Sequence, residues 1–168
     1  TKYVDKFVIV ESKFDHQGNK KKLNFNIDNF KKFKDKIKYL VIEEFPKGMT
    51  NWDRENYQRN YIANGIKDLD EDDYIIISDV DEIPNLESLE IGKIDQKIIM
   101  FRQEMFYYKF NLKLPNFFWT GTRACRKKYL KSPQWLRNIK VKKYSFFRFD
   151  VLFSETKYID IKIIQNGG

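Results

Sequence analysis

Residues 74–84 read YIIISDVDEIP, and this stretch decides the fold class that we expect. Its first four residues are apolar, a pattern typical of a strand buried on both faces of a sheet. Two similar apolar runs come earlier in the chain, FVIV at 7–10 and YLVI at 39–42. Helix-like spacing of apolar residues separates the three runs, so the order strand, helix, strand, helix, strand predicts an α/β fold with a parallel sheet.

The two expected helices cover about residues 27–37 and 52–67. Ile27, Phe30 and Phe33 recur at helical spacing among lysines, which indicates a short amphipathic helix. The second helix has Thr50 or Asn51 as its N-cap residue, with acidic side chains near its positive end.

The second half of the chain is rich in aromatic and β-branched residues, which favour strands. We expect a smaller mixed or antiparallel β part, packed on the first half within one domain of residues 1–168. Residues 1–84 would then be one half of this domain and residues 85–168 the other. The expected strand segments are 98–108, 117–124, 145–153 and 158–164, and short helices are expected over 86–89 and 134–138.

Composition narrows the possible partners and metal ligands. The formal net charge is +8, which favours anionic partners, although a solvated lysine-rich surface has the same composition. A single Cys and a single His exclude a Cys/His zinc site, so a metal would need oxygen ligands. No membrane span, signal peptide or glycosylation sequon is present in the sequence, so we expect a cytoplasmic or membrane-peripheral protein.

The strand ends are the first place to look for a site, because ligands of open α/β sheets bind beyond the carboxyl ends of the strands. Polar pairs follow the first two strands, at 11–12 and 43–44, and Asp79, Asp81 and Glu82 follow the third. In extended chain Asp79 and Asp81 would face one side while Val80 turns inward. Two such carboxylates suit Mg²⁺ or Mn²⁺ bridging to a diphosphate, and the alternative is a solvated acidic turn.

Several ordered motifs resemble glycosyltransferase family 17. The segment VDKFVIVES at 4–12 resembles the opening of that family, and DVDEIP at 79–84 continues the match. The further matching positions are Phe14, Gly18, Lys22, Leu23, Phe25, Phe45, Pro46, Trp52, Glu55, Tyr57 and Arg59. The resemblance covers about half of the chain and becomes diffuse from Phe101 onward.

The resemblance implies a GT-A-like fold with a parallel nucleotide-binding sheet flanked by helices. It also implies a UDP-sugar donor, which is UDP-N-acetylglucosamine in the best-known members, together with a glycan acceptor and Mn²⁺ or Mg²⁺. Asp79 and Asp81 would contact the metal and the ribose, with Asp81 favoured for direct coordination. Glu11 and Ser12 would line the nucleotide pocket, and Arg59 would contact phosphate or form a structural ion pair with Glu55.

The family is regarded as inverting, so a carboxylate base should deprotonate the acceptor hydroxyl. Glu82 and Glu104 are the candidates, and Glu82 is alternatively a support for the metal ligands. Six aromatic side chains of the second half could stack on an acceptor sugar or simply pack in the core. They are Phe106, Tyr107, Tyr108, Phe117, Phe118 and Trp119.

The chain departs from the family at its end. Family members carry a late Gly-Trp-His segment whose His is a candidate metal ligand, and this chain ends at Gly167-Gly168. We therefore expect a truncated chain, with a Golgi location if it comes from a eukaryotic member whose anchor is missing.

Two other functions remain open from the residues alone. One is a haloacid-dehalogenase-like phosphohydrolase, which also places Asp-x-Asp after an apolar strand but prefers the first strand. The other is a basic module that binds glycan or nucleic acid without catalysis. Nucleic acid is not the partner that we expect, because the lysine clusters are scattered over several elements.

Overall fold

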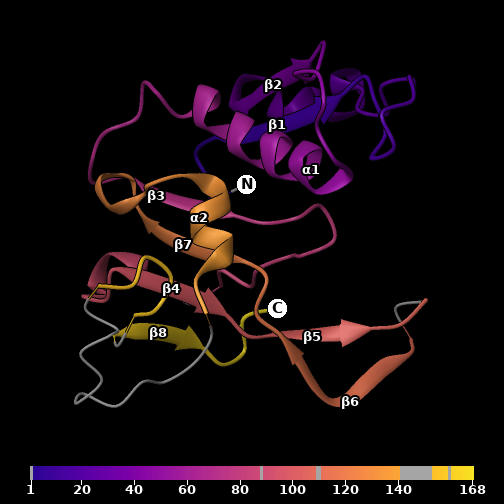
Figure 1. Ribbon diagram of the computed structural model, residues 1–168. Helices are drawn as coiled ribbons and strands as arrows, with labels where there is room; N and C mark the ends of the chain where they lie inside the picture. Colours follow the sequence, from indigo (N-terminus) through magenta and orange to yellow (C-terminus); the bar gives the residue numbers. More distant parts are fainter. Residues whose placement is uncertain (1, 88, 109–110, 141–152, 159) are drawn as a thin grey trace. The chain divides into compact units, whose positions relative to one another are not determined.

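The computed structural model describes residues 2–87, 89–108, 111–140, 153–158 and 160–168 (Figure 1). The chain divides into two compact units, Thr1–Leu69 with Ser132–Gln134 and Asp70–Lys131 with Trp135–Gly168. Within the described ranges, no helix combines the length and the apolar character needed to cross a membrane. The expected functional division at residue 84 stays a prediction.

The first unit contains two parallel strands, β1 (Phe7–Ser12) and β2 (Ile37–Ile42). They pair in register from Phe7 opposite Ile37 to Ser12 opposite Ile42. The sequence prediction of two strands here is confirmed. The helical elements of this unit are η1 (Ile27–Lys36), α1 (Asn51–Tyr61) and η2 (Ile62–Gly65).

Helix α1 begins with a reciprocal cap, as expected at Thr50. The Thr50 hydroxyl accepts the Asp53 N–H at 3.2 Å, and the Asp53 carboxylate accepts the Thr50 N–H at 2.9 Å. The helix is shorter than the predicted 52–67, because the chain tightens into the 3₁₀ turn η2. That turn brings Gly65 against β1, where an added Cβ would lie 2.3 Å from Val8.

The helix expected over 27–37 is a 3₁₀ helix with a break at Phe30, whose φ is −122°. Its rings at Phe30 and Phe33 are 43% and 38% exposed, so the apolar stripe gains little burial to hold an α-helix together. The expected helix is thus present over Ile27–Lys36, as a 3₁₀ helix.

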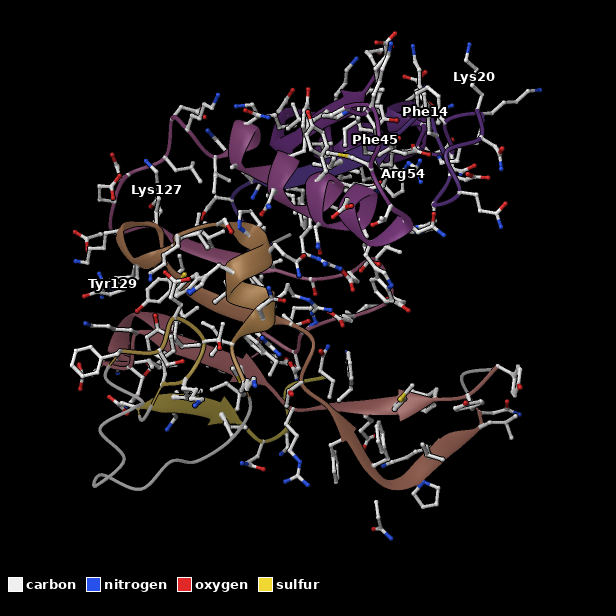
Figure 2. All side chains as sticks on the ribbon, viewed as in Figure 1. Phe14, Lys20, Phe45, Arg54, Lys127 and Tyr129 are labelled. Atoms are coloured by element: carbon white, nitrogen blue, oxygen red, sulfur yellow. The ribbon has the colours of Figure 1, made fainter. Side chains whose placement is uncertain are left out.

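The loop that follows β1 is fixed at several points in the first unit. Figure 2 shows Phe14, Phe45 and Arg54 gathered near this loop, and the two phenylalanine rings lie 6.1 Å apart. Arg54 donates to the His16 carbonyl at 3.0 Å. Gly18 permits the turn because its φ is +90°, a conformation that side chains disfavour.

The second unit contains a four-stranded mixed sheet in the order β3-β7-β4-β8. Its strands are β3 (Tyr74–Ile77), β4 (Ile98–Phe101), β7 (Arg123–Arg126) and β8 (Ile161–Ile164). Strand β7 is antiparallel to β3 and β4, whereas β4 and β8 are parallel. The third expected strand thus has the predicted residues but pairs with β7, so the parallel pairing that we expected for it is wrong.

This mixed sheet carries the core of its unit. Ile99, Phe101 and Ala124 are fully buried together, and the partly buried side chains packed on them come from β3, from residues 86–94 and from β8. Strand β4 reads Ile-Ile-Met-Phe and is buried at every position. A central strand with neighbours on both edges explains this continuous apolar run.

Strands β5 (Gln103–Phe106) and β6 (Lys113–Trp119) form a separate antiparallel ribbon. Short helices η3 (Ile91–Lys93), η4 (Lys127–Tyr129) and α2 (Pro133–Asn138) complete the described elements, and α2 confirms the helix expected near 134–138. The helix expected over 86–89 is wrong for its described residues, because the Asn85 side chain accepts the Glu87 N–H and forms a turn. Most of the strand expected over 145–153 lies outside the described residues.

Candidate functional site

A tight turn directly follows β3 and holds the acidic residues that the sequence singled out. The N–H of Glu82 donates to the Asp79 carbonyl at 3.0 Å, which closes the turn over Val80 and Asp81. The Ser78 hydroxyl lies 2.7 Å from the Glu82 carbonyl and 2.6 Å from the Thr122 hydroxyl. These bonds join the turn to the residue that precedes β7.

The turn changes how its carboxylates are presented. We expected extended chain, with Val80 facing inward between Asp79 and Asp81. Val80 is instead 102% exposed, because it occupies a corner of the turn, so that expectation is wrong. Asp81 occupies the second corner and is exposed, whereas Asp79 is half-buried.

Arg137, on α2, provides the positive charge at this turn. Its guanidinium donates to both Glu82 carboxylate oxygens at 2.7 and 2.9 Å and to Asp79 Oδ2 at 2.8 Å. The Arg137 and Glu82 side chains are only 10% and 8% exposed. A buried bidentate pair of this kind holds both groups in one geometry.

Glu82 has partners on both of its oxygens. Oε1 also accepts the indole N–H of Trp119 at 2.5 Å, and Oε2 accepts the Asp79 N–H at 3.0 Å. Burial raises the pKa of Glu82, but the hydrogen bonds from Arg137, Trp119 and Asp79 outweigh it, so the pKa is lowered. A carboxylate that is held ionised by four donors favours a structural role in the turn over a proton-accepting role.

Arg123, on β7, fixes the helix that carries Arg137. Its guanidinium donates to the Leu136 carbonyl at 2.9 Å and also to the Arg137 carbonyl, at the C-terminal end of α2. Burial, followed by repulsion from Arg137, lowers the pKa of Arg123 to about 10. The group remains charged at neutral pH and stabilises the helix end.

Sequence reasoning missed Arg137, Arg123 and Trp119 as parts of this site. Arg137 lies 58 positions from Asp79 along the chain, and no local pattern links two such positions. In this lysine-rich chain, an arginine on a short expected helix cannot be distinguished by sequence from the many charged side chains that lie in solvent. Trp119 was among the aromatic side chains expected either to stack on a sugar or to pack in the core, but its contact with Glu82 was not predicted.

The turn offers oxygen ligands that suit a hard cation only in part. Across the residues with described positions, no group of three or more His, Cys, Asp or Glu side chains is placed to hold a metal ion. Asp79 and Asp81 are two carboxylates of one turn, and Mg²⁺ or Mn²⁺ commonly takes one or two carboxylates together with phosphate and water. The donor set therefore fits such an ion when a phosphate group supplies further ligands.

The proposed nucleotide contacts at the end of β1 have structural partners in the first unit. Glu11 Oε1 accepts from Lys21 and the Asn24 N–H, both at 2.7 Å, and Oε2 accepts from the Phe25 N–H and Tyr39. Burial raises the pKa of Glu11, yet these hydrogen bonds lower it to about 2.

Ser12 and Arg59 also have structural contacts. Ser12 is 1% exposed, and its hydroxyl accepts the Phe14 N–H at 2.9 Å. Arg59 pairs with Glu55 at 3.0 Å, which is the ion pair that was expected as one alternative. The nucleotide contacts of Glu11, Ser12 and Arg59 stay predictions.

Glu104, the other candidate base, lies on β5 directly opposite Phe118 on β6. Its side chain is 42% exposed and pairs with Lys113. Glu104 is thus accessible, whereas Glu82 is not.

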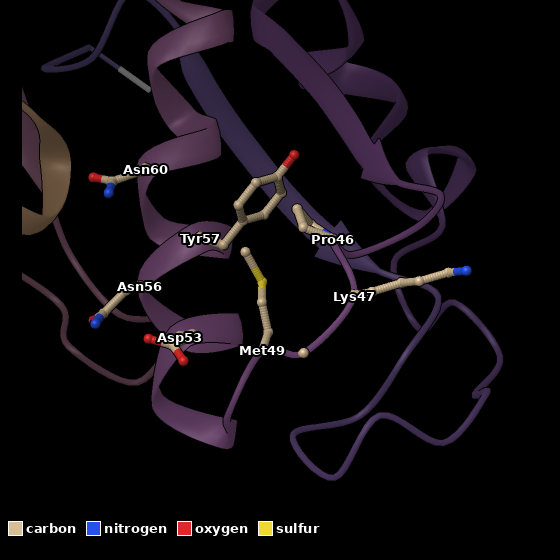
Figure 3. Close-up of a pocket in the computed structure, with 8 residues that line it drawn as sticks. Pro46, Lys47, Met49, Asp53, Asn56, Tyr57 and Asn60 are labelled. Atoms are coloured by element: carbon tan, nitrogen blue, oxygen red, sulfur yellow. The ribbon is translucent and has the colours of Figure 1, made fainter.

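A shallow pocket of about 400 Å³ lies between the loop after β2 and helix α1. Figure 3 shows Tyr57 and Met49 along its wall, with Lys47 on the loop. The other lining residues are Pro46, Gly48, Asp53, Asn56 and Asn60. None of the residues predicted to contact the nucleotide lines it.

The chain is similar in sequence to a known family and to several known proteins. The model of glycosyltransferase family 17 matches residues 1–144. Beta-1,4-mannosyl-glycoprotein 4-beta-N-acetylglucosaminyltransferase from Homo sapiens is 30% identical over 126 residues of alignment, which covers 69% of this chain and 23% of the human protein. The protein of the same name from Rattus norvegicus gives the same values, and that from Mus musculus is 29% identical over 126 residues.

The chain thus spans 23% of the length of these curated relatives. No solved structure matches it.

Proposed function

This chain belongs to glycosyltransferase family 17, and from that membership we propose that it transfers N-acetylglucosamine from a UDP-sugar to a glycan hydroxyl. The names of the relatives support this donor sugar and a β-1,4-mannosyl acceptor. Family membership also favours a transferase over the phosphohydrolase and the binding module that the residues alone left open. A GT-A-like fold is part of the proposal.

One observation carries the proposal, namely the acidic turn held by Arg137 at the end of a core strand. Arg137 bonds Glu82 at 2.7 Å and Asp79 at 2.8 Å, so the turn has one defined shape before a ligand arrives. This shape leaves Asp81 exposed at the corner. Preorganised groups of this kind need no rearrangement when charge develops during reaction.

Asp79 and Asp81 would hold Mn²⁺ or Mg²⁺ together with the donor diphosphate. When bound, the ion offsets the negative charge that develops on the departing UDP. Glu82 and Arg137 keep the Asp79 backbone in place, since the Glu82 carboxylate accepts the Asp79 N–H.

Glu104 is the better supported candidate for the base. It is exposed on the β5–β6 ribbon, and its carboxylate pairs with Lys113 of the same ribbon. An inverting reaction needs a carboxylate that can take the proton of the acceptor hydroxyl. Glu82 is unsuited to this step because four donors occupy it.

Calorimetric titration with UDP-N-acetylglucosamine, with and without Mn²⁺, tests the donor site. We expect binding that requires Mn²⁺ and that weakens by roughly tenfold or more in Asp81→Asn. Asp95→Asn is the matched control, because it removes one exposed carboxylate elsewhere in the same unit. Equal affinities of the two variants, or binding indifferent to Mn²⁺, would reject the proposed metal site.

Transfer assays separate the two candidate bases. Glu104→Gln should lower kcat while leaving the affinity for UDP-N-acetylglucosamine unchanged. Glu82→Gln should weaken donor binding as well, since it loosens the turn. A normal kcat in Glu104→Gln would remove Glu104 from the mechanism.

A further inference from the structure

The strand pairing between β5 and β6 is interrupted between Glu104 and Phe106. Glu104 pairs with Phe118, but Phe106 already pairs with Lys113, so residues 114–117 of β6 bulge out opposite a single residue of β5. Asn116 lies in this bulge with φ at +60°, a left-handed conformation that non-glycine residues seldom adopt. Bulges and such backbone conformations occur preferentially beside functional sites.

The bulge borders a second pocket, of about 520 Å³, which lies within the second unit. Its volume falls in the range of roughly 300–1,000 Å³ that is usual for small-ligand sites. Two aromatic rings line it together with amide, hydroxyl and guanidinium groups. The lining residues are Arg102, Asn116, Phe117, Phe118, Thr120, Ile163 and Gln165.

The polar groups of this pocket are partly fixed. The Arg102 guanidinium stacks on Phe118 at 3.7 Å from the ring centre and donates to Gln165 Oε1 at 2.8 Å. Phe117 is 44% exposed beside them, so its ring is accessible from solvent. Among the described residues that line the pocket there is no carboxylate, and Arg102, their one cation, already has two contacts, so this lining suits a neutral ligand.

The pocket lies next to the acidic turn in space, although the two are distant along the chain. Trp119, the residue between Phe118 and Thr120, donates to Glu82 at 2.5 Å. Gly121 also lies against Glu82, since a Cβ added there would be only 1.7 Å from Glu82 Oε1. The ribbon that lines the pocket is therefore bonded to the turn proposed to hold the donor diphosphate.

We propose that this pocket, which we call the ribbon pocket, binds a neutral pyranose ring of the acceptor glycan. A pyranose has an apolar C–H face that stacks on an aromatic ring and a rim of hydroxyl groups that exchange hydrogen bonds with amide and guanidinium groups. Phe117 supplies the accessible ring, and Asn116 and Gln165 supply the amides. The assignment to the acceptor rests on the proposed transferase function, whereas sugar binding does not.

Two variants with one control test the ribbon pocket. Phe117→Ala and Gln165→Ala remove a lining group each, and Phe153→Ala removes a phenylalanine side chain that is 89% exposed in the same unit but outside the pocket. The probe is a β-1,4-mannosyl oligosaccharide, titrated without donor and followed by saturation-transfer NMR. Transfer from UDP-N-acetylglucosamine to the same probe gives the acceptor KM.

We expect Phe117→Ala and Gln165→Ala to weaken oligosaccharide binding and raise the acceptor KM by roughly three- to tenfold. Phe153→Ala should bind the oligosaccharide as wild type does, and the affinity for UDP-N-acetylglucosamine should stay unchanged in all three variants. The ribbon pocket is rejected if wild-type protein does not bind the probe, if the two variants bind it normally, or if they lose donor affinity equally. If no UDP-sugar binds but the probe still binds through Phe117, the transferase proposal fails while sugar binding in the ribbon pocket stands.

Discussion

Replacing Arg137 by alanine should strongly destabilise the second unit. The change removes three charge-assisted hydrogen bonds and leaves the Glu82 carboxylate, which is 8% exposed, without its cation. Breaking a buried ion pair on one side typically costs about 3–5 kcal/mol. Asp79 is 42% exposed and can regain water, so its share is at most about 1 kcal/mol.

Urea and thermal unfolding, followed by circular dichroism, measure this loss. We expect the free energy of unfolding to fall by about 4 kcal/mol, and the midpoint temperature to fall by roughly 8–16 °C for a chain of this size. Lys93→Ala is the control, because it breaks a salt bridge with Glu90 whose side chains are 76% and 67% exposed. Lys93→Ala should lower the free energy of unfolding by less than about 1 kcal/mol.

A double variant separates the ion pair from the packing of the arginine stem. Glu82→Gln with Arg137→Met removes both charges but keeps a side-chain acceptor for Trp119. The double variant should be at least about 1 kcal/mol more stable than the summed losses of Glu82→Gln and Arg137→Met predict. A coupling of roughly this size is usual between residues in contact. Strict additivity, or a loss in Arg137→Ala no larger than in Lys93→Ala, would refute a buried, coupled pair at this turn.

Three further predictions concern other parts of the chain. Glu11 is 13% exposed, and its pKa of about 2 lies below the ordinary 4.5, so its ionised form stabilises the fold above pH 4.5 and this contribution is lost as pH falls toward 2. Glu11→Gln should therefore lower the free energy of unfolding by about 3 kcal/mol at pH 7. In acid titrations of unfolding, the variant should lose less stability than wild type between pH 4.5 and 2. Equal losses in the two proteins would contradict this prediction. Thr50→Ala should cost about 1 kcal/mol in urea unfolding, since it removes one side of the cap with Asp53, and Thr50→Ser should restore most of it. Burial raises the pKa of the Cys125 thiol to about 12, so a disulfide reagent should label it only after unfolding, and rapid labelling of native protein would show that the core strand opens.

Local patterns in the sequence located much of what matters. The apolar runs at 7–10, 39–42 and 74–77 each became a strand, because four consecutive apolar residues need burial on both faces wherever they pair. Thr50 was one of two expected helix caps, and such a local signal is readable because its partner Asp53 lies only three residues away. The acidic turn was found because its polar residues directly follow the apolar run at 74–77 and Pro84 ends the segment.

The same patterns failed where the partner of a segment is distant in sequence. The run at 74–77 is equally compatible with a parallel and an antiparallel neighbour, and only the pairing with β7 shows that its neighbour is antiparallel. The orientation of Val80 was wrong for a related reason, since extended alternation does not apply to a chain folded back by the bond between Glu82 and Asp79.

The sequence by itself determined where the carboxylates of this family 17 chain lie and that they follow a buried strand. Tertiary structure alone decided what surrounds them. Arg137 reaches Asp79 across 58 positions, and Trp119 reaches Glu82 across 37, to form the environment that separates a buried, fully bonded Glu82 from an exposed Asp81. Hydrophobic periodicity records burial one element at a time, whereas these contacts depend on which elements pack together.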